Sequence, residues 1–261
     1  MGNPHSSPVF GWRARIGFLH PSSGTVTAGE WSRWAPTGVA FVPSRFQVVD
    51  VVPEKVRGSE DDLARAATEL RSSDIDALVQ VGTPFGFIDG ADGDRALAER
   101  LTQAAGVPAV TMMTAVVEAL HHLGIHRPAI LTPYVDSLDA LLAARLVADS
   151  IEPAAMVGLG EISNLAINST PSQVAYRLAK KLWKETSDAD GLFISSGGLA
   201  TFDIIEILES DTGLPVVSSN SAGLWAGLRL VDVAPLIPGL GVLFAPGRNE
   251  GKSAPAGAQD R

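Results

Sequence analysis

Two stretches of this chain share one pattern, an apolar run that stops abruptly at small residues. Residues 76–87 (DALVQVGTPFGF) reach a Gly-Thr-Pro turn, and residues 191–199 (GLFISSGGL) reach a Ser-Ser-Gly-Gly turn. A strand that ends this way before a helix exposes backbone N–H groups at the carboxyl end of a parallel sheet, where α/β proteins bind anions. A tight turn that needs glycine only for its geometry is the alternative. The repetition favours a carboxylate or phosphate site.

The repeat extends to both sides of these stretches. Residues 15–23 parallel residues 127–135, and residues 106–111 parallel residues 213–218, so strands with polar tips and Gly-x-Pro turns recur in the same order. We therefore predict an α/β protein of two Rossmann-like (flavodoxin-like) lobes, with parallel sheets related by a pseudo-twofold axis and an active-site cleft between them. The expected division is a flexible tail at 1–14, a first lobe at 15–113 plus 219–244, a second lobe at 114–218 and a disordered tail at 245–261.

Composition limits the classes of function. The 261 residues are 46% hydrophobic and carry a net charge of −9 without a basic cluster, which argues against a nucleic-acid partner. The absence of cysteine excludes disulfides and thiol catalysis, and five histidines without ligand spacing argue against a metal. No apolar run is long enough to cross a membrane, and the first nine residues lack the apolar core of a signal peptide. We expect a cytoplasmic protein.

The hydrophobic pattern also predicts individual elements. Two strand-like pieces are expected at 39–42 and 46–52, and residues 164–169 are expected to form a polar loop. The other predicted strands and helices are strands at 16–19, 77–81, 129–132, 155–159 and 215–217 and helices at 59–70, 95–105, 115–123, 137–148, 173–185, 201–210 and 222–230.

His20 stands at the expected tip of the first strand, beside a proline-fixed turn. An imidazole at the carboxyl end of a strand is well placed for proton transfer, because its ordinary pKa lies near neutrality. The alternative is a histidine that only caps the turn. Nearby, Trp31 and Trp34 suit either the wall of an apolar pocket or the ordinary core, and the core is the commoner outcome.

Several motifs, in order, resemble the arylmalonate decarboxylase and maleate cis-trans isomerase group of the aspartate/glutamate racemase superfamily. The resemblance covers roughly residues 15–244. The motifs are His-Pro-Ser-Ser-Gly at 20–24, Gly-Thr-Pro at 82–84, Pro-Tyr at 133–134, Ser-Ser-Gly-Gly-Leu at 195–199, the segment 213–225 and Pro-Gly-Leu-Gly at 238–241.

The resemblance implies a reaction through a carbanion or enediolate next to a carboxylate, with two cysteines in the superfamily as acid, base or nucleophile. Gly82 occupies the first cysteine position, as in the decarboxylases, and Ser196 occupies the second. A serine hydroxyl is far less acidic than a thiol with a pKa of about 8.5. Ser196 can therefore hydrogen-bond an enediolate, but it is a poor proton donor.

The resemblance also implies a carboxylate cradle, which matches Thr83, Tyr134 and the Ser196-Gly197-Gly198 turn. Pro84 removes one backbone donor and a family hydroxyl from that cradle. The residues expected to bind substrate are Ser22, Ser23, Gly82, Thr83, Pro84, Tyr134, Ser196, Gly197 and Gly198, and those expected to act in catalysis are His20, Ser196 and Tyr134.

These observations predict a cofactor-independent enzyme that stabilises the enediolate of a small carboxylate. A decarboxylase-type lyase with His20 as the proton-transfer group is the leading hypothesis. The alternatives are a cis-trans isomerase or hydratase of an unsaturated diacid, and a non-catalytic carboxylate-binding protein. The expected partner is a small carboxylate, with no nucleic acid and no membrane, and a homo-oligomer is possible.

Overall fold

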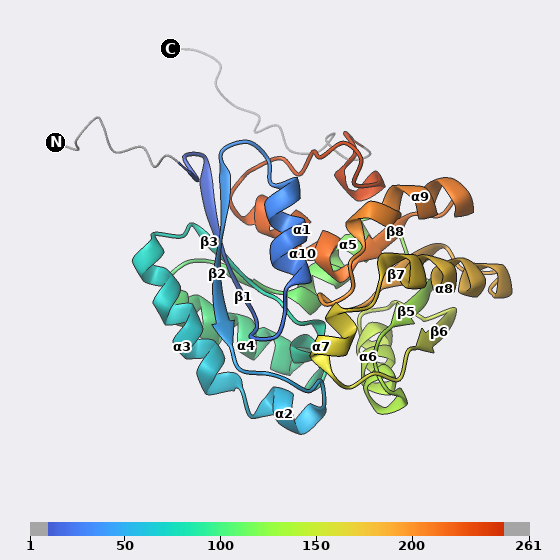
Figure 1. The fold of residues 1–261 in the computed structure, drawn as a ribbon, viewed down its shortest axis with the longest axis horizontal. Coiled ribbons are helices and arrows are strands. Elements are labelled where there is room, and N and C mark those ends of the chain that lie inside the picture. Colours follow the sequence, from blue (N-terminus) through green and yellow to red (C-terminus); the bar gives the residue numbers. More distant parts are fainter. Residues whose placement is uncertain (1–9, 248–261) are drawn as a thin grey trace, which may run out of the picture.

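The computed structural model describes residues 10–247, which form two parallel four-stranded sheets (Figure 1). The strand order is β2-β1-β3-β4 in the first lobe and β6-β5-β7-β8 in the second, so the second sheet repeats the first. This confirms the predicted α/β class and its repeated order. The strands are β1 (Ala14–Pro21), β2 (Val39–Phe46), β3 (Ala77–Gln80), β4 (Ala109–Thr111), β5 (Pro128–Thr132), β6 (Ala155–Gly158), β7 (Gly191–Ile194) and β8 (Val216–Ser218).

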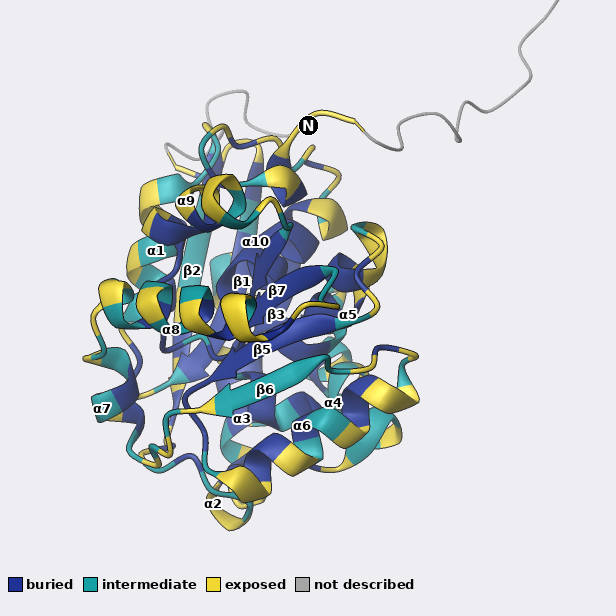
Figure 2. Ribbon diagram, turned by 90° about the vertical axis from the view of Figure 1, so that its right-hand side faces the viewer, coloured by how far each residue is buried: buried dark blue, intermediate teal, exposed yellow. Residues whose placement is uncertain are grey.

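The central strands are buried on both faces, as expected for parallel sheets covered by helices. Every residue of β3, β5 and β7 is buried, whereas the edge strand β6 is only half-buried. Figure 2 shows this contrast, with the inner strands in dark blue and most exposed residues on the outer helices. The apolar runs recognised in the sequence are therefore the cores of the two sheets.

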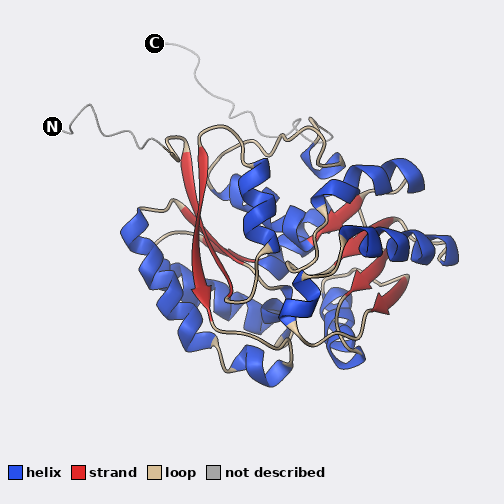
Figure 3. Ribbon diagram, in the orientation of Figure 1, coloured by secondary structure: helices blue, strands red, loops and turns tan. Residues whose placement is uncertain are grey.

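Helices surround both sheets (Figure 3). The helices are α1 (Val26–Trp34), α2 (Pro53–Arg57), α3 (Glu60–Leu70), α4 (Gly90–Ala105), α5 (Met112–His122), α6 (Asp136–Ala148), α7 (Asn164–Asn168), α8 (Ser172–Glu185), α9 (Phe202–Thr212) and α10 (Ser219–Leu230), with 3-10 turns η1 (Arg71–Ser73), η2 (Thr83–Gly86) and η3 (Val242–Phe244).

Helices α5 and α10 join the two lobes. Each begins at the residue after the last strand of its sheet, and the two helices pack against each other (Figure 1). Ten consecutive residues of α10, 219–228, are buried. A Cβ atom at Gly223 would lie 2.8 Å from the Met112 sulfur, so glycine permits this close packing. The helical interface between the lobes is therefore buried and allows close approach of α10 to α5.

A short antiparallel contact between loops also links the lobes, and we call residues 49–51 and 162–164 the interlobe strap. Val51 N–H donates to Ile162 O at 2.8 Å, and Asn164 N–H donates to Val49 O at 3.0 Å. Asp50 and Ser163 lie opposite each other between these two hydrogen bonds. The strap is held by few bonds compared with the helical interface.

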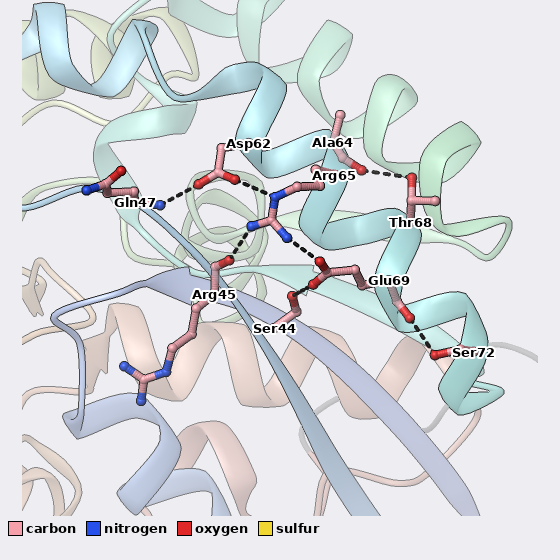
Figure 4. Close-up of polar contacts among 9 residues, drawn as sticks. All are labelled: Ser44, Arg45, Gln47, Asp62, Ala64, Arg65, Thr68, Glu69 and Ser72. Atoms are coloured by element: carbon pink, nitrogen blue, oxygen red, sulfur yellow. Dashed lines mark hydrogen bonds and ion pairs between the residues drawn. The ribbon is translucent and has the colours of Figure 1, made fainter.

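The end of β2 is fixed to α3 by Arg65 (Figure 4). The Arg65 guanidinium contacts Asp62 at 2.7 Å, contacts Glu69 and donates to the Arg45 carbonyl oxygen at 3.0 Å. Arg45 is paired in register with His20 on β1. This surface network therefore holds against α3 the end of β2 that pairs with His20.

The structure corrects several predicted boundaries. Residues 39–46 form one strand, and residues 47–52 form a loop, apart from the Asp50–Ser163 bridge. Helix α2 was not predicted, although Pro53 suits the first helical turn. Residues 164–168 form helix α7 rather than a loop, because the Ser163 side chain caps its start. Helix α4 begins at Gly90 rather than at residue 95, with Asp92 in its first turn.

Candidate active site

A cavity of about 490 Å³, measured out to its open mouth, lies at the carboxyl ends of the strands. Gly82 and Ser196 both line it, so the two repeated turns meet across one cleft, as predicted. None of its lining residues is Asp, Glu, Lys or Arg. The lining consists of His20, Pro21, Gly24, Thr27, Val48, Val51, Val56, Val81, Gly82, Thr83, Pro84, Phe85, Tyr134, Asn164, Asn168, Ser196, Gly197 and Gly198.

One side of the cavity is organised by the Ser219 hydroxyl at the start of α10. The hydroxyl oxygens of Ser219 and Thr83 lie 2.8 Å apart, and Ser196 N–H donates to Ser219 Oγ at 3.0 Å. Thr83, Ser196 and Ser219 are all at least nine-tenths buried. Ser219 therefore holds the two repeated turns at a fixed separation.

Tyr134 follows β5 and supplies the phenol on the same side. Its side chain is buried, and its hydroxyl lies 3.5 Å from the Ser195 hydroxyl. Burial raises the pKa of Tyr134 to about 12, and hydrogen bonds from Ser195, Thr83 and Ser196 oppose that rise only in part. The phenol therefore stays protonated at neutral pH and can donate a hydrogen bond to an anion.

The second turn has an unusual backbone at Ser196, whose φ of 96° lies in the region that favours glycine. Gly198 N–H donates to Ser196 Oγ at 3.1 Å, so the predicted donor Gly198 is already used within the turn. Among residues 10–247 the Gly197 N–H has no acceptor, and Gly197 lines the cavity. The Ser196 hydroxyl and the Gly197 N–H are therefore the donors left for a ligand.

The first turn depends on glycine at position 82. Gly82 has a φ of 125°, and a Cβ atom there would lie 2.9 Å from the Phe85 ring. The ring of Phe85 occupies the space into which a side chain at position 82 would project. Any side chain at this position, a thiol included, requires Phe85 to move.

His20 lies within β1 rather than at a free tip, because the strand continues to Pro21. Its ring is 1% exposed and stacks on Phe18 with centroids 5.2 Å apart. Burial, with a smaller contribution from the Arg45 charge, lowers the pKa of His20 to about 4. Its Nε2 is buried and has no hydrogen-bond partner among the described residues. A neutral imidazole thus lines the cavity with an unpaired nitrogen.

The cavity lining also has an apolar part. Valines 48, 51, 56 and 81 and Phe85 form this part, and sequence reasoning did not identify them. Ser22 and Ser23 do not line the cavity. The Ser23 hydroxyl instead donates to Val48 O at 3.1 Å. Trp31 is fully buried core, which agrees with the commoner of its two predicted roles.

Four polar residues at or behind the cavity wall were missed as functional residues: Asn164, Asn168, Thr27 and Asn220. Asn164 and Asn168 were expected in a loop, and only the fold of α7 brings them to the cleft. Asn220 lies within the segment 213–225 that carries part of the resemblance. That segment was the available signal for its importance.

Within residues 10–247, no group of His, Asp or Glu side chains could hold a metal ion. No helix in the same part of the chain is long and apolar enough to cross a membrane.

Comparisons with known proteins agree with this geometry. The family model described as arylmalonate decarboxylase matches residues 16–244. Arylmalonate decarboxylase of Bordetella bronchiseptica is 32% identical over 230 residues, which cover 88% of this chain and 95% of that protein. A liganded double mutant of arylmalonate decarboxylase matches with a TM-score of 0.83 at 32% identity, over 88% of this chain and 98% of that one. A maleate isomerase of Pseudomonas putida S16, crystallised with maleate, matches with a TM-score of 0.84 at 25% identity. The match covers 89% of this chain and 97% of that one.

Proposed function

The chain belongs to the arylmalonate decarboxylase family, and on this premise we propose that it is a cofactor-independent decarboxylase of a small malonate-type diacid with an apolar substituent. The observation that carries the proposal is the mixed lining of the cavity. Hydroxyl and backbone donors line it together with four valines and Phe85, and no Asp, Glu, Lys or Arg side chain does. The cavity suits one carboxylate at the donors and an apolar group against the valines.

This asymmetry provides a driving force for loss of one carboxylate. An ionised carboxylate placed against valine side chains loses hydration and gains no hydrogen bond, which raises its free energy. When its C–C bond breaks, CO2 leaves and the electron pair stays on the α-carbon. That pair delocalises into the retained carboxylate as an enediolate. The charge therefore moves from the leaving carboxylate toward the donors that bind the retained carboxylate.

The retained carboxylate is bound by the Thr83, Tyr134 and Ser196 hydroxyls and the Gly197 N–H. Ser219 holds Thr83 and the Ser196 turn in place, and the Tyr134 hydroxyl contacts Ser195. Donors fixed in place before reaction stabilise a developing enediolate more than the ground-state carboxylate. Removal of one such donor commonly lowers kcat by about 10²–10³-fold.

The α-carbon must then receive a proton, and His20 is the proposed donor. Its Nε2 is unpaired, and the bound diacid favours the protonated imidazole because opposite charges attract. The negative charge of a bound diacid raises the pKa of His20 from about 4. No thiol is available, and the Tyr134 phenol holds its proton up to a pKa of about 12.

The maleate isomerases are the second group of relatives, and a cis-trans isomerase or hydratase of an unsaturated diacid is the second candidate. Such a diacid needs hydrogen-bond donors at both ends. Asn168 accepts from Thr25 N–H and donates to Asn164 O, and Asn164 donates to Ser23 Oγ. Because these amides already form hydrogen bonds within the protein, few donors remain for the second carboxylate of such a diacid. The geometry therefore favours decarboxylation.

Further expectations accompany this proposal. The lobe boundaries at 113/114 and 218/219 and the cytoplasmic location are proposed from the sequence pattern. The net charge of −9 supports the proposal that no nucleic acid binds.

The test is incubation of the purified protein with phenylmalonate, maleate and malonate in D2O, followed by NMR. Conversion of phenylmalonate to α-deuterated phenylacetate supports the proposal. Conversion of maleate to fumarate or to a hydroxy diacid instead identifies the second candidate. Saturable binding of all three without turnover identifies a carboxylate-binding protein.

A further inference from the structure

The Glu30 carboxylate, on α1, lies outside the cavity lining and bridges three elements. One oxygen accepts from the backbone N–H groups of Thr201 at 2.6 Å and Phe202 at 2.8 Å, at the start of α9. The other oxygen accepts from Asn220 Nδ2 at 2.7 Å. A carboxylate that accepts three hydrogen bonds determines the position of each donor.

Asn220 connects the Glu30 carboxylate to the turn that lines the cavity. Its side chain is fully buried in α10, and its Nδ2 also donates to Gly197 O at 3.2 Å. Its Oδ1 accepts from the Thr27 hydroxyl at 2.8 Å, and that hydroxyl also lies 3.0 Å from Gly197 O. The carbonyl oxygen of Gly197 therefore accepts from Asn220, and the single Thr27 proton is shared between the Gly197 and Asn220 oxygens.

Gly197 lies in the turn that depends most on outside support. The φ of 96° at Ser196 is costly for a residue with a side chain, and such a conformation persists only when its surroundings fix it. Ser219 fixes the start of the turn through Ser196 N–H. Asn220 and Thr27 fix its middle, and Glu30 fixes Asn220.

We propose that Glu30 is a positioning residue, which sets the shape of the Ser196–Gly198 turn through Asn220 and thereby aims the Gly197 N–H into the cavity. The inference rests on the proposed function only in treating this turn as the anion cradle. The link from Glu30 to Gly197 is a property of the ligand-free protein.

The ionisation of Glu30 supports this role and makes it measurable. Burial raises the pKa of Glu30 to about 7, although its hydrogen bonds to Phe202, Thr201 and Asn220 favour the charged form. The charge of Asp203 raises this pKa further, and Asp203 is itself paired with Arg33 at 3.1 Å. As the pH falls through about 7, Glu30 gains a proton and loses acceptor capacity. The turn then loses part of its support.

The experiment follows the backbone amide resonances of Gly197 and Gly198 from pH 5.5 to 8.5 in the ligand-free protein. In the wild type both are expected to shift with a midpoint near 7, and Glu30→Gln should abolish the shift. In Asn220→Ser the Thr201 and Phe202 amides should still titrate while Gly197 no longer responds. Glu206→Gln, the same change at an exposed site on α9, is the matched control.

A Gly197 resonance that does not move in the wild type would overturn the inference, as would a midpoint near 7 that persists in Glu30→Gln. Retained dispersion of the other amide resonances shows that each variant is folded. Because no substrate is present, the result is independent of the turnover assay, and either proposal can fail without the other.

Discussion

The hydroxyl oxygens of Thr83 and Ser219 lie 2.8 Å apart, although 136 residues separate them in the chain. Thr83 follows the third strand of the first sheet, and Ser219 follows the last strand of the second. The same Ser219 oxygen accepts from Ser196 N–H. One buried hydroxyl therefore sets the distance between the two turns that form the polar side of the cavity.

Tyr134→Phe is expected to weaken phenylacetate binding about ten-fold or more. The phenol is a neutral donor in a buried site, and a hydrogen bond to a charged group contributes about 1.5–3 kcal/mol. Isothermal titration calorimetry at neutral pH measures the change. Tyr176→Phe removes the other tyrosine hydroxyl, which contacts Asp211 at the surface, and should leave affinity unchanged. Equal affinities in both variants would remove Tyr134 from the site.

His20→Ala should lower turnover of phenylmalonate by about 10²–10⁴-fold, the usual contribution of one positioned acid or base. Phenylacetate affinity should stay within a few-fold. The exposed His126→Ala variant is the matched control and should retain full turnover. Full turnover in His20→Ala would show that the proton comes from water or another group.

The titration of His20 gives a separate prediction. In the empty protein the imidazole resonances should titrate near pH 4, below the range first expected for a histidine in this position. A bound carboxylate attracts the imidazolium, so saturating phenylacetate should raise the midpoint. Two-dimensional NMR assigns the signal by its loss in His20→Gln. An unchanged midpoint with bound phenylacetate would place the imidazole out of reach of the ligand.

Arg145→Met is expected to destabilise the fold by about 3–5 kcal/mol, the usual cost of leaving a buried charge unpaired. Arg145 contacts Asp94 at 2.8 Å and donates to Gly86 O, and both its side chain and that of Asp94 are almost fully buried. Urea unfolding measures the change. The exposed Arg100→Met variant, which loses two surface ion pairs, should cost less than about 1 kcal/mol. Similar losses of unfolding free energy in the two variants would show that burial of the Arg145–Asp94 pair does not contribute to stability.

The interlobe strap should part when substrate enters, because it is held by two backbone hydrogen bonds and its residues Val51 and Asn164 line the cavity. Asp50 and Ser163 form a non-hydrogen-bonded antiparallel pair, whose Cα atoms lie about 4.5 Å apart in such ladders and suit a disulfide. The double cysteine variant should lose at least about ten-fold in turnover when oxidised.

Reduction of that variant should restore the rate. The two single cysteine variants are the controls, and the natural absence of cysteine leaves no competing thiol. Full turnover of the oxidised double variant, with the disulfide verified by mass spectrometry, would show that substrate enters elsewhere.

The features that were predictable from the sequence are those encoded locally. The apolar runs before Gly82 and Ser196 predicted strands, and their repetition predicted two similar sheets with one cleft. The strand pattern predicted an anion site at the two turns, and the resemblance to the decarboxylase group assigned Thr83, Tyr134 and Ser196 to it. Neither step needed knowledge of long-range packing.

The features that were not predictable depend on contacts distant in sequence. Helices α2 and α7 are five residues each, too short for a periodic signal. The low pKa of His20 depends on burial and on Arg45, which reaches it only because β2 pairs with β1. Glu30 meets Asn220 across 190 residues. Sequence patterns within one segment do not indicate these contacts between distant residues.

Helix α10 also has a consequence for the order in which this chain can fold during its synthesis. It follows the last strand of the second sheet but packs against α1 and β3 of the first, where Trp31 Nε1 donates to Asn220 O. The N-terminal sheet is translated early, yet one of its covering helices leaves the ribosome only after residue 230. Apolar surface on that sheet stays uncovered until then. The first lobe is therefore the first to be made and cannot be the first to finish folding.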